Sequence, residues 1–161
     1  MKHKIVALFC FFLVGTAFSM AQTNLNVNDV FDRYGKQEGS VLVQLASDIL
    51  SQGGSKITFY KSLIIDDLPH IKQDIQNAIK ADVEGKIIIS EVKKNGQIES
   101  CSYYLGKDKS SKSEFILYSN KGRKITVVYL KGNFSPAHLD SELKKLKDLF
   151  IYVNNKRLKI Q

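Results

Sequence analysis

Few side chains in this 161-residue sequence could serve as catalytic bases, since the chain has only three histidines. A nucleophilic mechanism needs a Ser, Thr or Cys beside a base and a site for the oxyanion. His3 lies in a leader-like segment, which leaves His70 and His138 as candidate bases. Each falls in the first turn of a predicted helix, where an exposed polar side chain is common. A hydrolase built on either histidine therefore stays an alternative, and an enzyme is less favoured than a binding protein.

Two pairs of acidic residues could do acid and base chemistry if their carboxyl groups faced each other. Asp66 and Asp67 are adjacent and precede Pro69, so they are better explained as caps and dipole partners of the helix that follows. Glu91 and Glu99 flank a predicted turn and could be cross-strand neighbours. As like charges they more plausibly face solvent, with nearby lysines relieving the repulsion.

Metal and cofactor sites find little support in the residue types present. Two scattered histidines and no acidic cluster at loop-ligand spacing give neither a zinc nor a calcium pattern. Gly53-Gly54 lacks the residues that make a phosphate-binding loop. Cys101 lies mid-strand and is expected to be a small buried hydrophobe rather than a reactive thiol. We therefore predict no cofactor.

The most visible polar feature is a run of basic residues near the C-terminus. Such a cluster could bind anionic lipid or glycan of the cell envelope by long-range attraction that salt weakens. A solvated helix face is the alternative, because lysine commonly fills exposed helical positions. Nucleic acid is not an expected partner, since the cluster lacks interleaved aromatic residues for base stacking. The candidate anion-binding residues are Lys144, Lys145, Lys147, Lys156, Arg157 and Lys159.

The first 21 residues have the layout of a secretory signal. Two lysines precede an apolar run from residue 5 to 14, and small residues follow up to Ala21, where cleavage is expected. The run is shorter than the roughly 20 residues that span a bilayer. Cys10 sits inside the run, so lipid attachment is not expected. Cleavage would remove two lysines and lower the net charge from +8 to +6. We predict a periplasmic or secreted protein without a membrane anchor, in which residues 22–161 form one domain.

Local patterns predict the elements that must position these side chains. Asn28 could cap a short helix that ends at a left-handed Gly35. Residues 41–46 suit either a buried strand or the start of a longer helix through Leu50, and periodicity does not separate the two. We favour the strand, followed by a helical turn that ends at Gly53 and Gly54. Residues 57–65 alternate as a strand, and apolar residues at steps of three and four then predict a helix from Pro69 to Gly85.

The second half of the chain predicts an antiparallel meander. Its four strands cover residues 86–92, 98–105, 114–119 and 124–131, and Asn95-Gly96 is a strong hairpin signal. Ser135-Pro136 begins a last helix that should run to about residue 148, and the tail could add a strand. The fold class is α+β: a single domain with a mainly antiparallel sheet of about five to six strands covered by helices.

Three short motifs resemble a known family. They are Phe31-Asp32-Arg33-Tyr34, then Lys36-Gln37-Glu38-Gly39, and finally residues 125–132 with Asn133-Phe134. Together they are similar to small exported proteins of Bacteroidota-type bacteria that are classed as a domain of unknown function. The resemblance covers residues 30–146. It implies export and the fold, and it assigns no catalytic residue. Many members look like envelope lipoproteins, whereas this sequence lacks the cysteine that would carry the lipid.

These patterns favour a non-enzymatic binding domain whose partner is an unknown envelope protein. Binding of anionic lipid or glycan through the basic residues is the first alternative, and a hydrolase is the second. A lined cavity in the structure would favour a small molecule, and a flat apolar patch would favour a protein partner.

Overall fold

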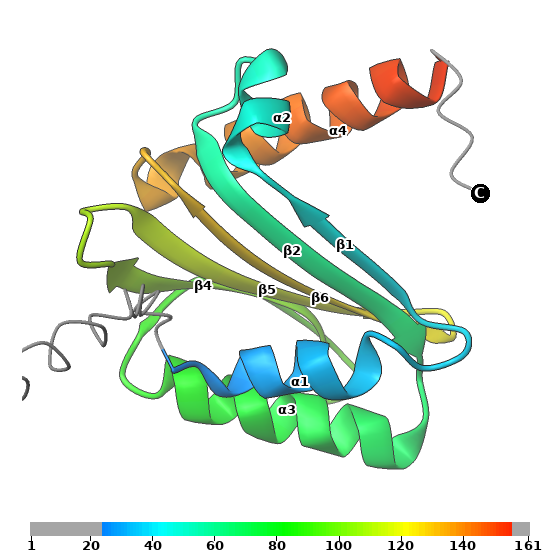
Figure 1. Ribbon diagram of the computed structural model, residues 1–161. Coiled ribbons are helices and arrows are strands. Elements are labelled where there is room, and N and C mark those ends of the chain that lie inside the picture. The colour runs from blue at the N-terminus through cyan, green and yellow to red at the C-terminus, as the bar shows by residue number, and fades with distance from the viewer. Residues whose placement is uncertain (1–23, 156–161) are drawn as a thin grey trace, which may run out of the picture.

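A single six-stranded antiparallel sheet forms the centre of the protein (Figure 1). The computed structural model describes residues 24–155, with side chains described up to residue 147. The strands lie in the order β1-β2-β6-β5-β4-β3, so β1 and β3 form the two edges. Their bounds are Val41–Leu45 (β1), Ile57–Asp66 (β2), Ile87–Lys94 (β3), Gln97–Lys107 (β4), Ser113–Lys121 (β5) and Lys124–Gly132 (β6). The predicted α+β fold class is confirmed.

Four α-helices cover the sheet, two on each face (Figure 1). One face carries α1 (Asn26–Tyr34) and α3 (Pro69–Val83). The other carries α2 (Ser47–Gln52) and α4 (Leu139–Asn155), and the short 3-10 helix η1 (Pro136–His138) leads into α4. Within the described part of the chain, no helix is long and apolar enough to cross a membrane. The predicted leader, residues 1–21, lies outside the described residues.

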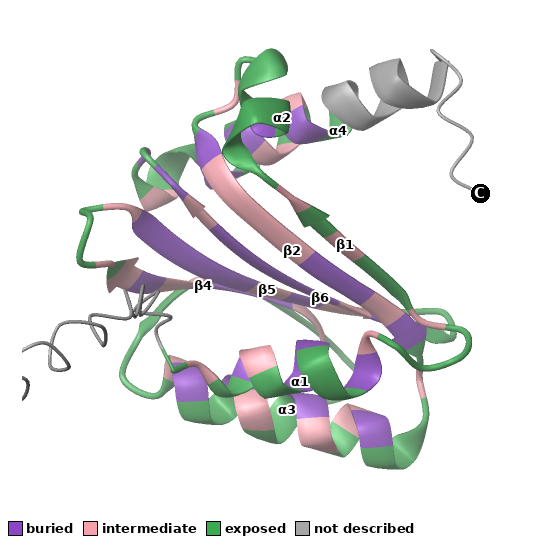
Figure 2. Ribbon diagram, in the orientation of Figure 1, coloured by how far each residue is buried: buried purple, intermediate pink, exposed green. Residues whose placement is uncertain are grey.

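The sheet separates two hydrophobic clusters (Figure 2). In the first, Phe31 and Ile75 from the two helices pack on Leu63, Ile116 and Val127 of the central strands. In the second, Leu139 and Leu146 of α4 and Leu50 of α2 pack on Phe115 and Leu130. Because strand side chains alternate between faces, the central strands β5 and β6 contribute to both clusters.

The predicted meander is confirmed strand by strand. β3, β4, β5 and β6 pair consecutively and antiparallel. Asn95 and Gly96 have φ of 51° and 76°, the left-handed conformation that a two-residue hairpin of this type requires. The turn between β5 and β6 likewise places Gly122 at φ 67°. Local turn chemistry thus fixes the register of this half of the sheet.

The predicted start of the first helix was wrong, whereas its predicted end at Gly35 is confirmed. The cap position is Leu25, not Asn28, and its side chain caps nothing. The hydrogen-bond acceptor that caps α1 is instead Asp82 of α3, whose carboxylate accepts from the backbone N–H groups of Asn26 and Val27, each at 2.8 Å. Gly35 is not left-handed, since its φ is −66°. Glycine is needed there for space, because a Cβ would lie 2.5 Å from the Phe31 carbonyl oxygen.

β1 is an exposed edge strand, not the buried strand that its apolar sequence suggested. Val41 and Leu42 are 52% and 39% exposed. The strand pairs only with β2, and an apolar run by itself does not distinguish a central strand from an edge.

The acidic pair before α3 also differs from its predicted capping role. The N-cap of α3 is Leu68, and no side chain caps the helix. Asp66 instead pairs with Lys124 across the β2–β6 ladder, at 2.7 Å. Asp67 accepts a hydrogen bond from the Asn120 side chain at 3.1 Å. Asp66 therefore fastens the end of the sheet, whereas Asp67 connects the sheet to α3, because its carboxylate also lies 3.9 Å from the Lys72 ammonium.

The last helix runs further than predicted. α4 continues to Asn155, so residues 150–155 are helical rather than part of a last strand. Residues 156–161 lie outside the described part. The predicted stripe is confirmed for Leu139 and Leu146, which are 1% and 3% exposed.

Candidate functional site

The structure divides the basic residues proposed to bind anions. Lys144, Lys145 and Lys147 all lie on α4, but Lys145 bonds the buried carboxylate of Glu142 at 2.8 Å. Lys144 and Lys147 are exposed. Lys156, Arg157 and Lys159 lie outside the described residues. Of the proposed cluster, Lys144 and Lys147 are therefore the described residues that form no ion pair with another described residue.

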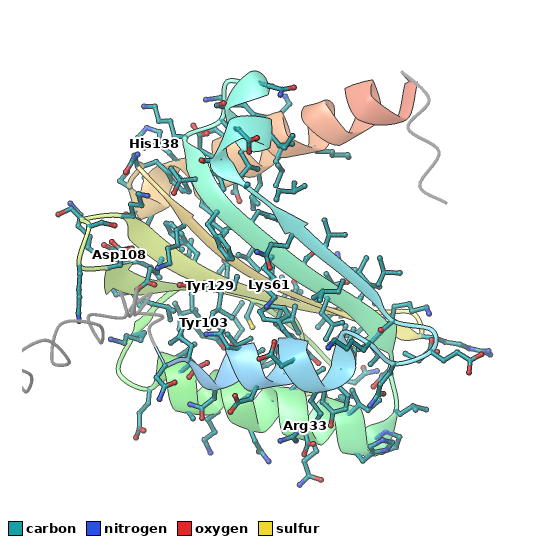
Figure 3. The ribbon with its side chains drawn as sticks, viewed as in Figure 1. Arg33, Lys61, Tyr103, Asp108, Tyr129 and His138 are labelled. Atoms are coloured by element: carbon teal, nitrogen blue, oxygen red, sulfur yellow. The ribbon has the colours of Figure 1, made fainter. Side chains whose placement is uncertain are left out.

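The two candidate histidines do not converge. His70 begins α3 on one face of the sheet, whereas His138 ends η1 on the other (Figure 3 shows His138). The His138 Nδ1 atom lies 2.9 Å from the Ser135 hydroxyl. Ser135 and His138 both lie in the exposed turn that leads into α4, so this contact is part of the local structure of the turn. The hydrolase alternative would need a further polar group to orient His138, and the hydrogen bonds of the described residues supply none.

The remaining acidic candidates are also separated. Glu91 lies opposite Cys101 rather than Glu99. The two-residue turn already offsets Glu91 from Glu99, and the irregularity between Val92 and Lys93 shifts the pairing by one further residue. The Glu91 carboxylate lies 2.8 Å from the Lys93 ammonium, which agrees with the prediction that nearby lysines offset its charge. Among the described residues, no group of three or more His, Cys, Asp or Glu side chains could hold a metal ion.

A third acidic cluster was missed by the sequence reasoning. The Lys131 ammonium lies 3.2 Å from both Asp108 and Glu114, and the Tyr129 hydroxyl donates to Glu114 at 2.5 Å. Although burial opposes it, hydrogen bonds from Ser110, Lys112 and Lys131 hold the pKa of Asp108 below its usual value. Asp108 also accepts from two backbone N–H groups of the β4–β5 loop. The cluster therefore ties the β4–β5 loop to β5 and β6. Figure 3 labels Asp108 and Tyr129 of this cluster.

Cys101 is confirmed as a buried side chain, 5% exposed. Burial raises the pKa of its thiol, so the neutral form is favoured. A thiol of this kind behaves as a small hydrophobe rather than as a nucleophile.

Cys101 lies at the floor of a half-open pocket between α3 and strands β4 and β5. Its volume is about 310 Å³. One stripe of α3 forms a wall, because Gln76, Ile79, Lys80 and Val83 recur at helical spacing and all line the pocket. Ile98, Tyr103 and Tyr118 of the sheet complete the lining.

Tyr118 gives this pocket its most unusual polar atom. The residue is only 3% exposed. Its hydroxyl forms no hydrogen bond of ordinary geometry with a described residue, although the side-chain amides of Gln76 and Asn120 lie close to it. Burial raises the pKa of this hydroxyl, although the amides of Gln76 and Asn120 oppose the shift. A buried hydroxyl normally has a partner, and leaving one without costs about 1–3 kcal/mol. Strand alternation could have shown that Tyr118 faces the core, but not that its hydroxyl is unpaired.

A second hollow lies on the opposite face, between α4 and the sheet. Its volume is about 280 Å³, and serine and threonine side chains of β3 to β6 line much of it. The Ser90 and Ser102 hydroxyls bond each other at 2.6 Å across the β3–β4 ladder. This hollow is thus more polar than the pocket beside α3.

The β3 edge is the most apolar exposed part of the sheet. Ile87, Ile88 and Val92 are 60%, 55% and 49% exposed. Ile87 lies opposite Tyr104 and Ile88 opposite Tyr103, so their side chains point to different faces. Within the described part of the chain β3 pairs only with β4.

Neither curated proteins nor solved structures include one that matches this chain. A family model, by contrast, matches residues 14–143, which is most of the sequence and includes every strand of the sheet. The resemblance seen in the short motifs near residues 31–39 and 125–134 is therefore confirmed, and the chain belongs to a family of unknown function, DUF6108.

Proposed function

We propose that the protein is a non-enzymatic binding domain of the periplasm or the cell exterior. It binds an extended segment of another envelope protein as an additional strand beside β3. The observation that carries this proposal is the outer edge of β3, which pairs with no other strand of the described residues and exposes isoleucine and valine side chains.

An edge strand offers two kinds of contact to an extended peptide. Its outward N–H and C=O groups can pair with the peptide backbone, and side chains on alternate faces select the sequence. On β3, Ile88 projects toward the α1 and α3 side, whereas Ile87 and Val92 project toward the α4 side. A bound strand would therefore cover apolar side chains on both faces of the sheet.

The protection of this edge is uneven. Proteins block edge strands with lysines and bulges. β3 has Lys93 and Lys94 at its hairpin end, and bulges interrupt its register after Ile88 and after Val92. At the other end, Lys86 precedes the strand, and residues 87–90 carry no charge. This end is consequently open to pairing, while the hairpin end limits the length of the strand that can add.

β1 offers a shorter alternative. It has five residues compared with eight in β3, and it leads directly into α2. A peptide at β1 would form fewer backbone hydrogen bonds, so β3 is the favoured edge.

The test is a comparison of Ile88→Lys with Leu68→Lys. Leu68 is 46% exposed and precedes α3, so the control adds the same charge at an apolar residue away from the edge. An envelope fraction should yield a discrete protein that is retained by the wild type and by Leu68→Lys and is lost with Ile88→Lys. Hydrogen exchange of β3 amides should slow in the complex.

Equal retention by both variants, or slowed exchange at another element, would contradict pairing at β3. Sedimentation of the protein alone supplies a second readout. A concentration-dependent dimer that Ile88→Lys abolishes would show that a second copy of the chain occupies the edge, and the envelope-partner proposal would fail.

A further inference from the structure

We propose that the pocket between α3 and β4 binds a small organic carboxylate with an apolar body. The site is distinct from the β3 edge and does not depend on the pairing proposed there. Three properties of the pocket support this ligand: the pocket volume, the buried hydroxyl of Tyr118, and the Lys80 ammonium at the rim.

The volume limits the size of the ligand. Small-molecule sites commonly occupy about 300–1,000 Å³, and at about 310 Å³ this pocket lies at the lower end. It suits a molecule of the size of a medium-chain fatty acid. A long-chain lipid would extend beyond the pocket.

The walls determine the character of the ligand body. Ile79, Val83 and Ile98 contribute aliphatic surface, and the Cys101 thiol adds a neutral, weakly polar group at the floor. Burial of an apolar body against these side chains is favourable by about 25 cal/mol for each Å² removed from water. A ligand that is polar throughout would gain little of this energy.

The Tyr118 hydroxyl selects for an acceptor oxygen. The Tyr118 side chain lines the pocket, and its hydroxyl is buried. The hydroxyl forms no hydrogen bond of ordinary geometry with a described residue, although the side-chain amides of Gln76 and Asn120 lie close to it. A ligand oxygen that accepts this O–H would remove the cost of the unpaired group and add a hydrogen bond. Bonds of this kind to a charged acceptor are the stronger ones, which favours a carboxylate over a neutral oxygen.

Lys80 supplies the matching charge. Its side chain is exposed at the rim of the same pocket, and it forms no ion pair with any described residue. Gln76, one turn earlier on α3, lines the same rim and can donate through its amide. An anionic group at the mouth is thus attracted by the ammonium, whereas an amine is repelled.

The experiment is an NMR titration of the protein, purified from cells that express the whole chain, with octanoate, 1-octanol and octylamine as probes. Octanoate should give saturable shifts at the amides of Ile79, Val83, Ile98, Cys101 and Tyr118. The alcohol and the amine should bind at least about tenfold more weakly, as expected for loss of a charge-assisted hydrogen bond. Equal binding of octanoate and 1-octanol, or shifts centred elsewhere, would overturn the proposal.

Two substitutions separate the contributions of the polar groups. Tyr118→Phe removes only the hydroxyl and should weaken octanoate about tenfold, while its thermal unfolding shows that the fold is kept. Lys80→Gln should weaken octanoate about threefold, the scale of an exposed ion pair, and leave 1-octanol unchanged. Matched controls on the opposite face are Tyr104→Phe and Lys144→Gln, which should change neither affinity.

Unchanged octanoate affinity in Tyr118→Phe would also overturn the assignment. If that variant does not fold, Val83→Phe gives an independent test, because the larger ring occupies the pocket from α3. It should abolish the octanoate shifts, and retained binding would place the ligand elsewhere.

Discussion

Buried carboxylates act in this protein as connectors between elements that are distant in sequence. Asp82 of α3 accepts hydrogen bonds from both the backbone and the side chain of Asn26, and from the backbone of Val27. The negative charge also lies at the positive end of the α1 dipole. Asp82 thereby provides the cap that the N-terminal sequence of α1 lacks.

Glu142 makes the equivalent connection on the other face. It is 3% exposed and accepts from the Lys56 backbone N–H at 2.7 Å and from the Ser55 hydroxyl at 3.1 Å. Lys145 pairs with its other oxygen at 2.8 Å. Although burial opposes ionisation, these donors lower the pKa of Glu142 below its ordinary value of 4.5.

This lowered pKa predicts how stability responds to acid. A carboxyl whose folded pKa lies below its unfolded pKa stabilises the protein above the unfolded value and loses that contribution as the pH falls through the folded pKa. We expect Glu142→Gln to be less stable than the wild type at pH 7, and the difference in unfolding free energy to shrink below pH 4.5. Urea denaturation at a series of pH values measures the difference.

Asp140→Asn is the matched control for that series. Asp140 is an exposed acid in the same first turn of α4, so its substitution should leave the wild-type pH profile almost unchanged. A Glu142→Gln deficit that stays constant down to pH 2 would show that the carboxylate contributes by packing and not by its charge.

Residue environments were predictable only where they depend on neighbours in sequence. The alternation of side chains along β4 was enough to predict that Cys101 is buried. The Asn95-Gly96 turn was predictable because both residues readily adopt positive φ. Asp82 could not be assigned, because its partners lie 56 and 55 residues away. The same holds for the unpaired Tyr118 hydroxyl, whose surroundings come from α3 and β5 together.

The order of strands in the sheet, which local sequence does not show, determines which strands are central and which lie at an edge. The meander β3 to β6 pairs sequential neighbours, so its hairpins were readable from local turns. β2 instead pairs with β6, across more than 50 residues of chain, and this leaves β1 at an edge. The exposure of β1 follows from that long-range pairing.

The two helical layers should loosen separately, because the sheet divides their cores. Phe134 stacks on Phe115 with centroids 5.1 Å apart and joins the α4 segment to the sheet. Phe134→Ala should cost about 3–5 kcal/mol, and hydrogen exchange should then speed up in α4 before α3. Ile75→Ala, in the opposite cluster, should cost about 2–5 kcal/mol and reverse that order. Equal acceleration in both layers would indicate one cooperative unit.

For the whole molecule, the two faces and the edges of the sheet have different chemistry. The α1 and α3 face contains the apolar pocket with its single unpaired hydroxyl, and the α4 face contains the hollow lined by serines. The exposed apolar residues gather instead at the edges β1 and β3. Small-molecule binding and peptide pairing therefore use different residues of adjoining surfaces, which meet where Ile88 lies opposite Tyr103 of the pocket.

The net positive charge of the whole protein can attract a polyanion even without a specific anion-binding site. With Lys145 bonded to Glu142, the described part of the cluster on α4 presents Lys144 and Lys147. Exposed charges act on a polyanion mainly through the summed field of the protein, which salt screens. We therefore expect Lys144→Glu/Lys147→Glu to elute earlier from a heparin column, and by the same salt interval as Lys36→Glu/Lys109→Glu, which changes the charge equally at two exposed lysines elsewhere. A clearly larger effect of the α4 pair would establish a local site for anionic lipid or glycan on that helix.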